Sequence, residues 1–308
     1  ALRADRELAM CAVRQDWRAL EYVSAALRAD AELVGAALEQ DWRALSFAAA
    51  PLRGDPQVVL AAVRRGGHAL LYATAALRAD RAVVSAAVAQ DWAALEFAAH
   101  ELRADRDVVL AAVRQYGRAL DLASEALQDD RQVVLAAVQQ DWRALEYASH
   151  RLKGDQEIVL KAVQQDAFAL LHATPAVKQD RNFVLAAARL NKAVLPLSAP
   201  EFLGDRDFVL AAAQSDGHTL RYAASALKAD REIVLAAVGR NGEALQYAAQ
   251  EFKADREIVM AAVRQHGGAL QYAASEVKAD RGIVLAAVQQ LRAGLGSGSE
   301  RVHPQSVG

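Results

Sequence analysis

Hydrophobic and polar positions recur along this chain with a fixed period of 25 residues. When the sequence is divided into blocks of 25 from Ala1, position 5 is Asp in every block, position 12 is Ala and position 20 is Leu. Twelve blocks follow one another without insertion or deletion. We number them as repeats 1 to 12 and give each residue a position within its repeat. A period this strict is the signature of a repeat array, in which each unit packs on its neighbours.

The pattern within one repeat predicts a pair of short helices. In repeat 10, residues 226–250, Asp230 stands before a run of apolar residues at helical spacing, so it is the expected N-cap. Asn241-Gly242 predicts the end of this helix, with the glycine in a left-handed conformation. A second apolar face begins at Leu245. We therefore expect two helices of roughly ten residues in each repeat, which must pack together because such short helices are marginal alone.

Three variations refine this expectation. Gly54, Gly154 and Gly204 stand just before the Asp, where a C′ glycine fits. Four repeats have Asp-Trp at the first turn, where the Asp can cap the second helix instead, and the sequence leaves open which geometry each repeat adopts. Tyr or Phe recurs at position 22, and we expect these rings to fill the core between repeats.

The predicted fold is all-α, an α-solenoid of twelve 25-residue helical-hairpin repeats that forms a single array over residues 1–295. The last repeat lacks the apolar pattern of a second helix, so residues 296–308 are expected to be a Gly/Ser-bearing C-terminal tail. The array is expected to be irregular at residues 175–205, where Pro175, Pro196 and Pro200 cluster. Pro196 falls inside an expected second helix, and breaking that helix would bend the array or change its twist.

Composition narrows the chemistry. The net charge of −2, from 36 basic and 38 acidic residues, argues against a dedicated nucleic-acid binder. The longest apolar runs, such as Ile233 to Val238, are far shorter than the roughly 18 residues of a membrane span. Cys11 is the only cysteine and is expected to be a small buried hydrophobe, and the seven histidines are expected on surfaces or boundaries. We predict no enzyme activity, no cofactor, no metal and no small-molecule ligand, because no motif for these is present.

Two basic ladders flank the Asp ladder. Position 3 is Arg or Lys in most repeats, position 6 is frequently Arg, and acids recur at position 7. We interpret these alternating signs as salt-bridged, solvated edges. The alternative is a surface that tracks nucleic acid, since helical repeats can read one base each.

Four apolar residues interrupt usually polar positions within a short stretch: Phe168, Leu171, Leu190 and Leu203. Phe168 and Leu171 stand where repeat 6 has Arg and Glu, Leu190 replaces a recurrent Gln, and Leu203 lies in the position-3 basic ladder. Either these side chains fill a gap left by the helix broken at Pro196, or they form an exposed patch that binds a partner protein. Both possibilities stay open from the sequence.

The segment LKADREIVLAAV-x-x-NG-x-ALQYA at residues 227–248, echoed at 252–273, resembles a tandem-repeat family catalogued as a domain of unknown function. The resemblance covers about residues 1–290. That family forms long arrays in protists, notably dinoflagellate and related algae, and occurs in some bacteria and large viruses. The resemblance implies the helical-repeat fold and a protist source, but it implies no activity.

We predict a non-catalytic protein-binding or structural scaffold subunit with other protein subunits as partners. A narrower form is an accessory subunit of a large organellar assembly, photosynthetic or other. The alternatives are a nucleic-acid-binding array and the regulatory part of a longer enzyme. The chain shows no signal peptide and no starting Met, so we expect a processed product or a piece of something longer, in the cytoplasm or an organelle interior.

Overall fold

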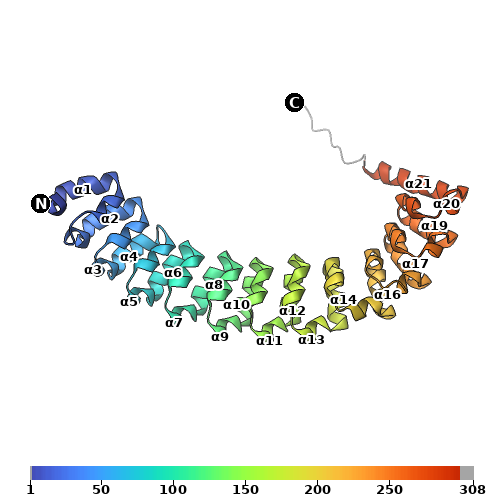
Figure 1. Ribbon diagram of the computed structural model, residues 1–308, viewed down its shortest axis with the longest axis horizontal. Helices are drawn as coiled ribbons and strands as arrows, with labels where there is room; N and C mark the ends of the chain where they lie inside the picture. Colours follow the sequence, from blue (N-terminus) through green and yellow to red (C-terminus); the bar gives the residue numbers. More distant parts are fainter. Residues whose placement is uncertain (1, 299–308) are drawn as a thin grey trace, which may run out of the picture. The chain divides into compact units, whose positions relative to one another are not determined.

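The computed structural model describes the backbone of residues 2–298 and the side chains of residues 2–293. Its contacts divide the chain into unit 1, residues 1–165, and unit 2, residues 166–308, and each is described by itself. Within residues 2–298 the regular elements are all helices and none is a strand (Figure 1). The predicted all-α array of helical repeats is therefore confirmed.

Each repeat contains one long α-helix that begins directly after the position-5 Asp. In unit 1 these helices are α1 (Arg6–Gln15), α2 (Ala31–Gln40), α4 (Pro56–Val63), α6 (Arg81–Gln90), α8 (Arg106–Gln115), α10 (Arg131–Gln140) and α12 (Gln156–Gln165). In unit 2 they are α14 (Arg181–Leu190), α16 (Arg206–Ser215), α17 (Arg231–Arg240), α19 (Arg256–Gln265) and α21 (Arg281–Gly298). The predicted capping is confirmed: the Asp130 carboxylate accepts the backbone N–H groups of Gln132 and Val133 at 2.8 and 3.0 Å.

The second helix of a repeat is a 3₁₀-helix of five or six residues, so the prediction of ten residues is wrong. In unit 1 these are η2 (Trp17–Glu21), η4 (Trp42–Phe47), η5 (Gly67–Tyr72), η6 (Trp92–Phe97), η7 (Gly117–Leu122) and η8 (Trp142–Tyr147). In unit 2 they are η9 (Ala167–His172), η10 (Lys192–Leu197), η11 (Gly217–Arg221), η13 (Gly242–Tyr247) and η14 (Gly267–Tyr272). The 3₁₀-helix is short because extended residues such as Ala48, with φ −63° and ψ 145°, end it.

A third helical turn occupies the rest of the 25 residues and leads into the next Asp. It is α-helical in α3 (Ala50–Arg53), α5 (Ala75–Arg78), α7 (His100–Arg103), α9 (Glu125–Gln128), α11 (His150–Lys153), α13 (Pro175–Lys178), α15 (Pro200–Gly204), α18 (Gln250–Lys253) and α20 (Ser275–Lys278). It is 3₁₀-helical in η1 (Leu2–Ala4), η3 (Leu27–Ala29) and η12 (Leu227–Ala229). One repeat therefore has three short elements, and two ten-residue helices would not fit beside this turn.

Position 16 joins the long helix to the 3₁₀-helix in an extended conformation. Asp16 has φ −149° and ψ 119°, and its carboxylate caps η2 by accepting the N–H of Arg18 at 2.9 Å. Asn241 caps η13 in the same way. The left-handed glycines predicted at helix ends are wrong, because no described residue has a positive φ. Gly242 instead allows close approach, since a Cβ there would lie 2.2 Å from the carbonyl oxygen of Ala262.

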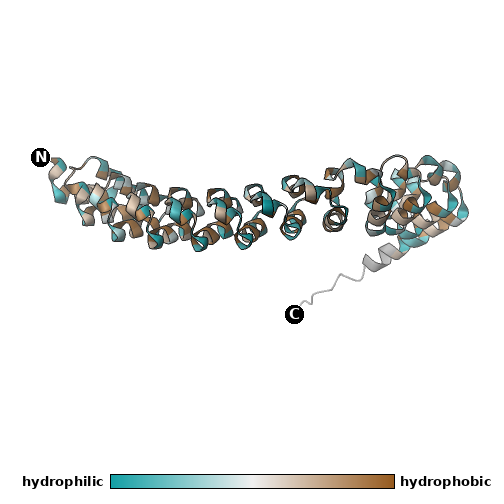
Figure 2. Cartoon of the chain, turned by 90° about the horizontal axis from the view of Figure 1, so that it is seen from below, coloured by the Kyte–Doolittle hydropathy of each residue, from teal (hydrophilic) through white to brown (hydrophobic). Residues whose placement is uncertain are grey.

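The core lies between the long helices and the 3₁₀-helices. Val134, Ala137 and Val138 of α10 are fully buried, and so is Leu145 of η8. Figure 2 shows that brown apolar and teal polar residues occur together on the same helices. Burying one such Val or Leu stabilises the fold by about 1.5–3 kcal/mol. The position-22 rings are not in this core, contrary to expectation: Tyr22 is 62 % exposed and its counterparts in the neighbouring repeats are half-buried.

A glutamine at position 15 ties a repeat to the one before it. Gln165 accepts the backbone N–H of Trp142 through its amide oxygen at 3.0 Å and donates to the carbonyl of Val138 at 2.6 Å. Gln290 likewise accepts the N–H of Gly267 at 2.7 Å. We call this contact the glutamine clasp. Its amide satisfies backbone groups at a helix end and a 3₁₀-helix start, where intrahelical partners are missing.

The predicted break at Pro196 is wrong. Helix η10 runs through Pro196 over Lys192–Leu197, the span its counterparts have, and it packs beside η9 and η11. In a 3₁₀-helix the missing N–H costs one bond to the third residue back, and the Pro196 ring is exposed to solvent. Elements of the usual kinds therefore continue through residues 175–205.

The first residues of the predicted tail at 296–308 belong to a helix. Helix α21 continues to Gly298, because Leu291 stands at position 16 where other repeats have residues that end the long helix. Residues 299–308 lie outside the described part of the chain. The prediction that residues 1–295 form a single array stays a prediction.

Candidate partner-binding surfaces

Phe168 and Leu171, two of the four predicted patch residues, lie on one edge of η9 in unit 2. Their side chains are 54 % and 52 % exposed. Residues three apart in a 3₁₀-helix lie one above the other, so these two face solvent together. The N–H of Phe168 donates to the Asp166 carboxylate at 2.9 Å, which fixes the start of η9. The exposed alternative for these two side chains is therefore the one that the structure shows.

Leu190 is also exposed, at 48 %. It occupies position 15, where the clasp residue of a regular repeat lies against the first residue of the preceding 3₁₀-helix, as Gln290 does at Gly267. The equivalent place for Leu190 is the start of η9, which begins at Ala167. We define Phe168, Leu171 and Leu190 as the unit 2 patch.

Leu203 does not join this patch. It is half-buried on α15, two repeats further along the chain than η9. Side chains at position 3 reach the end of the preceding 3₁₀-helix, as Lys178 does when it donates to the carbonyl of Leu171 at 3.1 Å. By the same equivalence Leu203 lies toward Pro196, where an apolar side chain fits an apolar neighbour.

Unit 1 carries a second surface that was not predicted, a run of rings along its 3₁₀-helices. We call it the aromatic ladder: Trp17, Trp42, Phe47, His68, Tyr72, Trp92, Phe97, Tyr116, Trp142 and Tyr147. Each of these side chains is half-buried, so an edge or a face of the ring meets solvent.

Contacts link the ladder from each repeat of unit 1 to the next. The ring centroids are 5.9 Å apart for Trp17 and Phe47, 6.4 Å for Trp42 and Tyr72, and 5.7 Å for His68 and Phe97. Repeats 4 and 5 are joined by the stacked rings of Trp92 and Tyr116, at 4.4 Å. Repeats 5 and 6 are joined by Arg118, which donates to the Tyr147 hydroxyl at 3.2 Å. These separations suit favourable aromatic packing.

Arginines lie over three of the ladder's indoles. The guanidinium carbons of Arg18, Arg43 and Arg143 are 5.0, 5.0 and 4.7 Å from the ring centroids of the preceding tryptophans. Each of these arginines also pairs with the Asp at position 16, and the Arg43–Asp41 distance is 2.9 Å. The ladder is therefore aromatic and hydrogen-bonding, with its positive charge locally balanced.

The sequence contained a signal for this ladder. Trp-Arg occurs at positions 17 and 18 in repeats 1, 2 and 6, and all four tryptophans of the chain stand at position 17 in repeats 1 to 6. The ladder was not predicted because the position-22 rings, which contact the tryptophans, were expected in the core.

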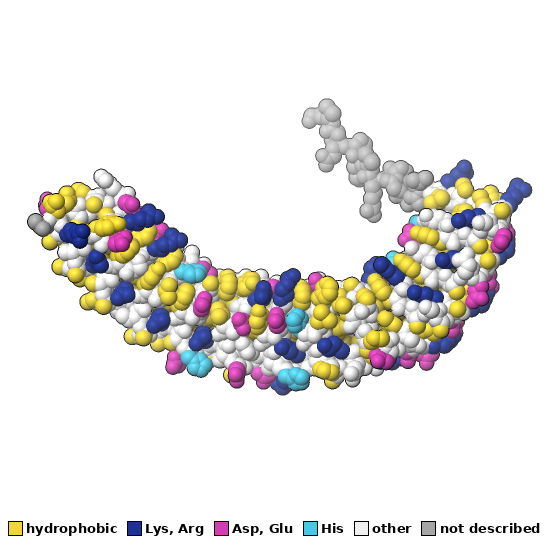
Figure 3. All heavy atoms as spheres, in the orientation of Figure 1, with side chains coloured by type: hydrophobic (Ala, Val, Ile, Leu, Met, Phe, Trp, Pro, Cys, Tyr) yellow, Lys and Arg dark blue, Asp and Glu magenta, His cyan; other side chains and the backbone are white. Residues whose placement is uncertain are grey.

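The second basic ladder forms ion pairs between successive repeats. Arg81 contacts Asp105 and Asp107 at 2.7 Å each, and the same arrangement joins Arg206 to Asp230 at 2.7 Å. The Arg81 guanidinium hydrogen-bonds to Asp105 and holds the pKa of that carboxyl below its ordinary value. The interpretation of salt-bridged, solvated edges is thus confirmed for position 6. Figure 3 shows basic and acidic side chains interspersed over the visible face of each unit.

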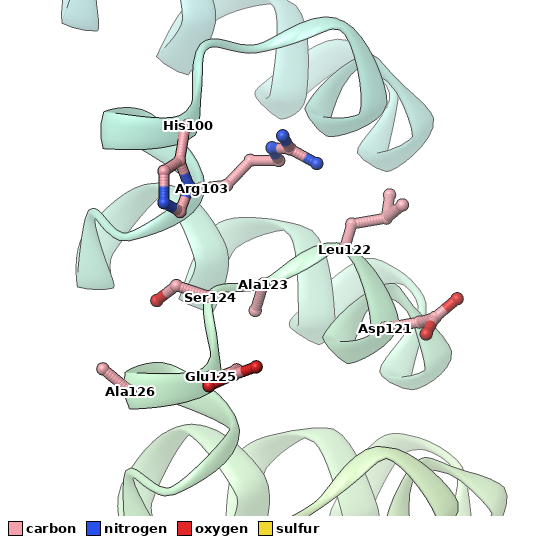
Figure 4. Close-up of a pocket in the computed structure, with 8 residues that line it drawn as sticks. All are labelled: His100, Arg103, Asp121, Leu122, Ala123, Ser124, Glu125 and Ala126. Carbon is pink, nitrogen blue, oxygen red and sulfur yellow. The ribbon is translucent and has the colours of Figure 1, made fainter.

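A cavity of about 480 Å³ lies between α7 and the segment 121–126 (Figure 4). His100 and Arg103 lie on one side of it, and Ser124 lies on the other. Nε of Arg103 and Oγ of Ser124 are buried without a hydrogen-bond partner among the described residues. Buried Nε atoms without a partner recur at Arg28, Arg53 and Arg78, so this feature belongs to the position-3 ladder of unit 1 generally.

Other candidate chemistry is dispersed. Within the described residues no three His, Cys, Asp or Glu side chains converge as a metal site would require. Cys11 is exposed, contrary to expectation, because its position on α1 faces solvent. His303 lies outside the described residues. No helix among them is both long and apolar enough to cross a bilayer.

The repeats match a known family over most of the chain. The profile of the family described as a domain of unknown function, DUF4116, matches residues 5–53, 55–103, 80–128, 105–153, 130–178, 155–203, 205–253 and 255–291. This chain belongs to the DUF4116 family. Five of the matches, between residues 55 and 203, overlap in steps of one repeat, and the others follow end to end, as expected for DUF4116 repeats in tandem. No curated protein and no solved structure matches the chain significantly.

Proposed function

We propose that this DUF4116 chain is a non-catalytic scaffold whose repeats bind protein partners. The observation that carries the proposal is the unit 2 patch, where Phe168 and Leu171 are each more than half exposed. Proteins seldom leave neighbouring apolar side chains bare unless a partner covers them, and interface centres are built from such side chains. A tandem helical-repeat array is itself suited to a scaffold or binding role.

The fold does not require the patch. Repeat 6 has Arg143 and Glu146 at the positions of Phe168 and Leu171, and its 3₁₀-helix η8 has the same length as η9. Both sequences are therefore compatible with the element, so the exposed ring and the exposed leucine need an explanation other than folding. A protein partner supplies one.

The recurrent carboxylates support a role without catalysis. The position-5 Asp residues, the chain's most regular acidic set, are engaged in capping the long helices and in pairing with arginines, as at Asp30 and Asp230. Groups committed to such contacts stabilise the array.

A narrower form of the proposal is an accessory subunit of a large organellar assembly, photosynthetic or other. It is supported by the distribution of the family that the sequence resembles. Identification of the subunits that co-purify with the native protein from its source is the measurement that tests it.

Exchange of two patch residues tests the binding role. Phe168→Arg with Leu171→Glu gives η9 the residues of η8, so helicity and melting temperature should stay unchanged. Recovery of the native partners from an extract of the source, quantified by mass spectrometry, should fall about tenfold or more because the interface centre is lost.

Leu71→Glu is the matched control. Leu71 also stands at position 21 and is 47 % exposed, but it belongs to unit 1. It should leave the recovered partners unchanged. Equal recovery with the double variant would contradict the proposed patch, and so would an equal loss with Leu71→Glu.

A further inference from the structure

We infer that the aromatic ladder of unit 1 binds an extended, proline-rich segment of a partner protein in the polyproline II conformation. The inference rests on the proposed protein-binding function, but it concerns other residues and the other unit. It is carried by the placement of the rings, by their period along the array and by the charge around them.

The ladder is not needed to build the repeat. Where unit 1 has Trp17, Trp42, Trp92 and Trp142 at position 17, unit 2 has Ala, Lys or Gly. Ala167 begins η9 and Lys192 begins η10, and both helices have the six-residue length of η4. A tryptophan held half-exposed where alanine suffices for folding indicates a surface that contacts something else.

The period expected for the ladder is close to that of a polyproline II helix. Helices packed side by side are about 8–10 Å apart, so the ladder offers a new set of rings at about this interval. A polyproline II helix has three residues per turn and a rise of 3.1 Å, so one of its faces repeats about every 9 Å. A proline-rich segment lying along unit 1 can therefore place one residue of each turn against one repeat.

The chemistry of the ladder also fits this occupant. Proline rings pack on aromatic side chains, and a polyproline II helix makes no internal hydrogen bonds, so its carbonyls are free to accept. The indole N–H groups of Trp17 and Trp92 donate no hydrogen bond within the described residues, whereas the pyrrole edge of Trp42 packs against Gly66. An indole that offers a ring and a free donor suits a ligand that is apolar along one edge and accepting along its backbone.

Charge favours a proline-rich segment over single-stranded nucleic acid, which can also stack on aromatic rings. The arginines nearest the indoles are already paired: Arg18, Arg43 and Arg143 each contact the position-16 Asp of their own repeat. The phosphates of a nucleic acid would be repelled by these carboxylates as well as attracted by the guanidinium groups. An uncharged polyproline helix meets no such repulsion.

Intrinsic fluorescence gives a direct test, because all four tryptophans of the chain belong to the ladder. Oligoproline peptides of 6, 12, 18 and 24 residues are titrated into the full chain, with glycine-serine peptides of equal length as controls. Tryptophan emission should change with the proline peptides alone. Affinity should rise with length up to about 18 residues, which is six turns and six repeats, and then level off.

Two variants locate the site. Trp42→Ala, which takes the residue that repeat 7 has at this position, should weaken binding of the 18-residue peptide about tenfold or more, with helicity retained. Trp17→Ala serves the same purpose if Trp42→Ala melts early, since the Trp17 ring packs on one other ring, that of Phe47. Tyr247→Ala in unit 2 is the control and should leave affinity unchanged.

Failure of the peptide to bind, or binding that ignores both tryptophan variants, overturns the inference. Tighter binding of a 12-residue oligothymidine, with affinity that falls steeply as salt rises, overturns it in favour of nucleic acid. Neither result would contradict the proposed scaffold function, because that function is tested separately by the Phe168 and Leu171 double variant in unit 2. Conversely, loss of native partners by the unit 2 double variant would not change the interpretation of oligoproline binding to unit 1.

Discussion

The position-5 aspartate does two things at once in this fold. At Asp130 one carboxylate accepts two backbone N–H groups at the start of α10 and also the guanidinium of Arg106, at 3.2 Å. The first contact satisfies a helix end, and the second joins the helix to the preceding repeat. One residue type thus closes both a local and an inter-repeat contact. The capping contact is the more general of the two, since Asp55 and Asp80 cap their helices although Ala31 and Pro56 stand where the arginine would be.

Removing one cap should cost stability without touching any chemistry. Asp130→Ala is expected to lower the free energy of unfolding by about 0.5–2 kcal/mol, because two helix N–H groups lose their acceptor. Denaturant melts measure the total, and hydrogen exchange at Gln132 and Val133 localises it. Asp130→Asn should recover most of the loss, since Asn also caps helices. Loss of a bound metal or of an activity in Asp130→Ala, with exchange unchanged, would contradict the capping role.

The ion pairs predict an acid limit. Hydrogen bonding to Arg81 lowers the pKa of Asp105 in the folded chain below its ordinary value of 3.8. A lowered folded-state pKa contributes stability that is present above the unfolded value and lost as pH falls through the folded one. The melting temperature should therefore decrease when the pH is lowered below about 4. Asp105→Asn can still cap the helix but has no charge. The melting temperature of this variant should therefore decrease less steeply with falling pH. Equal slopes for the two proteins would show that the Arg81–Asp105 pair is not involved.

At the scale of the element, the glutamine clasp sets how firmly successive repeats hold together. Ser215 occupies position 15 of repeat 9, and a small cavity lined by Ala188, Lys192 and Ser215 lies where a glutamine amide would fit. Position 15 changes along repeats 7, 8 and 9. Gln165 forms the clasp, whereas Leu190 and Ser215 lack the side-chain amide.

Restoring the clasp should stabilise unit 2. Ser215→Gln is expected to raise the free energy of unfolding by about 0.5–1.5 kcal/mol, the net worth of a hydrogen bond, by bonding the Lys192 N–H and filling the cavity. The reverse change, Gln140→Ser, removes the bond to Gly117 and should destabilise unit 1. Thermal melts of both variants check this. A stabilised Gln140→Ser, or a destabilised Ser215→Gln, would show that the clasp does not hold the repeats together.

At the scale of the molecule, the period alone predicted the repeat, the caps and the helical class. These follow from local rules, since an Asp before an apolar run caps a helix wherever it occurs. The six-residue 3₁₀-helix was not predictable in the same way. Its length depends on the extended residues after it and on the extra turn, and both the tolerance of Pro196 and the exposure of Tyr22 follow from that geometry.

The candidate surfaces show the same division. Phe168, Leu171 and Leu190 were found because they break a pattern in the sequence, and the structure places all three in solvent. The aromatic ladder was missed because its residues obey a pattern. Residues that recur at one repeat position were expected to be part of the core. The sequence alone does not show which side of a 3₁₀-helix they occupy.

The missing clasps have a consequence for cooperativity. A repeat array behaves as a one-dimensional chain of coupled units, and the coupling at each junction decides whether neighbours melt together. Where Leu190, Ser215 and Arg240 replace the glutamine, three successive junctions lack the clasp that Gln140 and Gln165 provide, so we expect their coupling to be weaker. Repeats on either side of these junctions can then open separately, so unfolding would proceed in blocks and a single melting temperature would describe none of them.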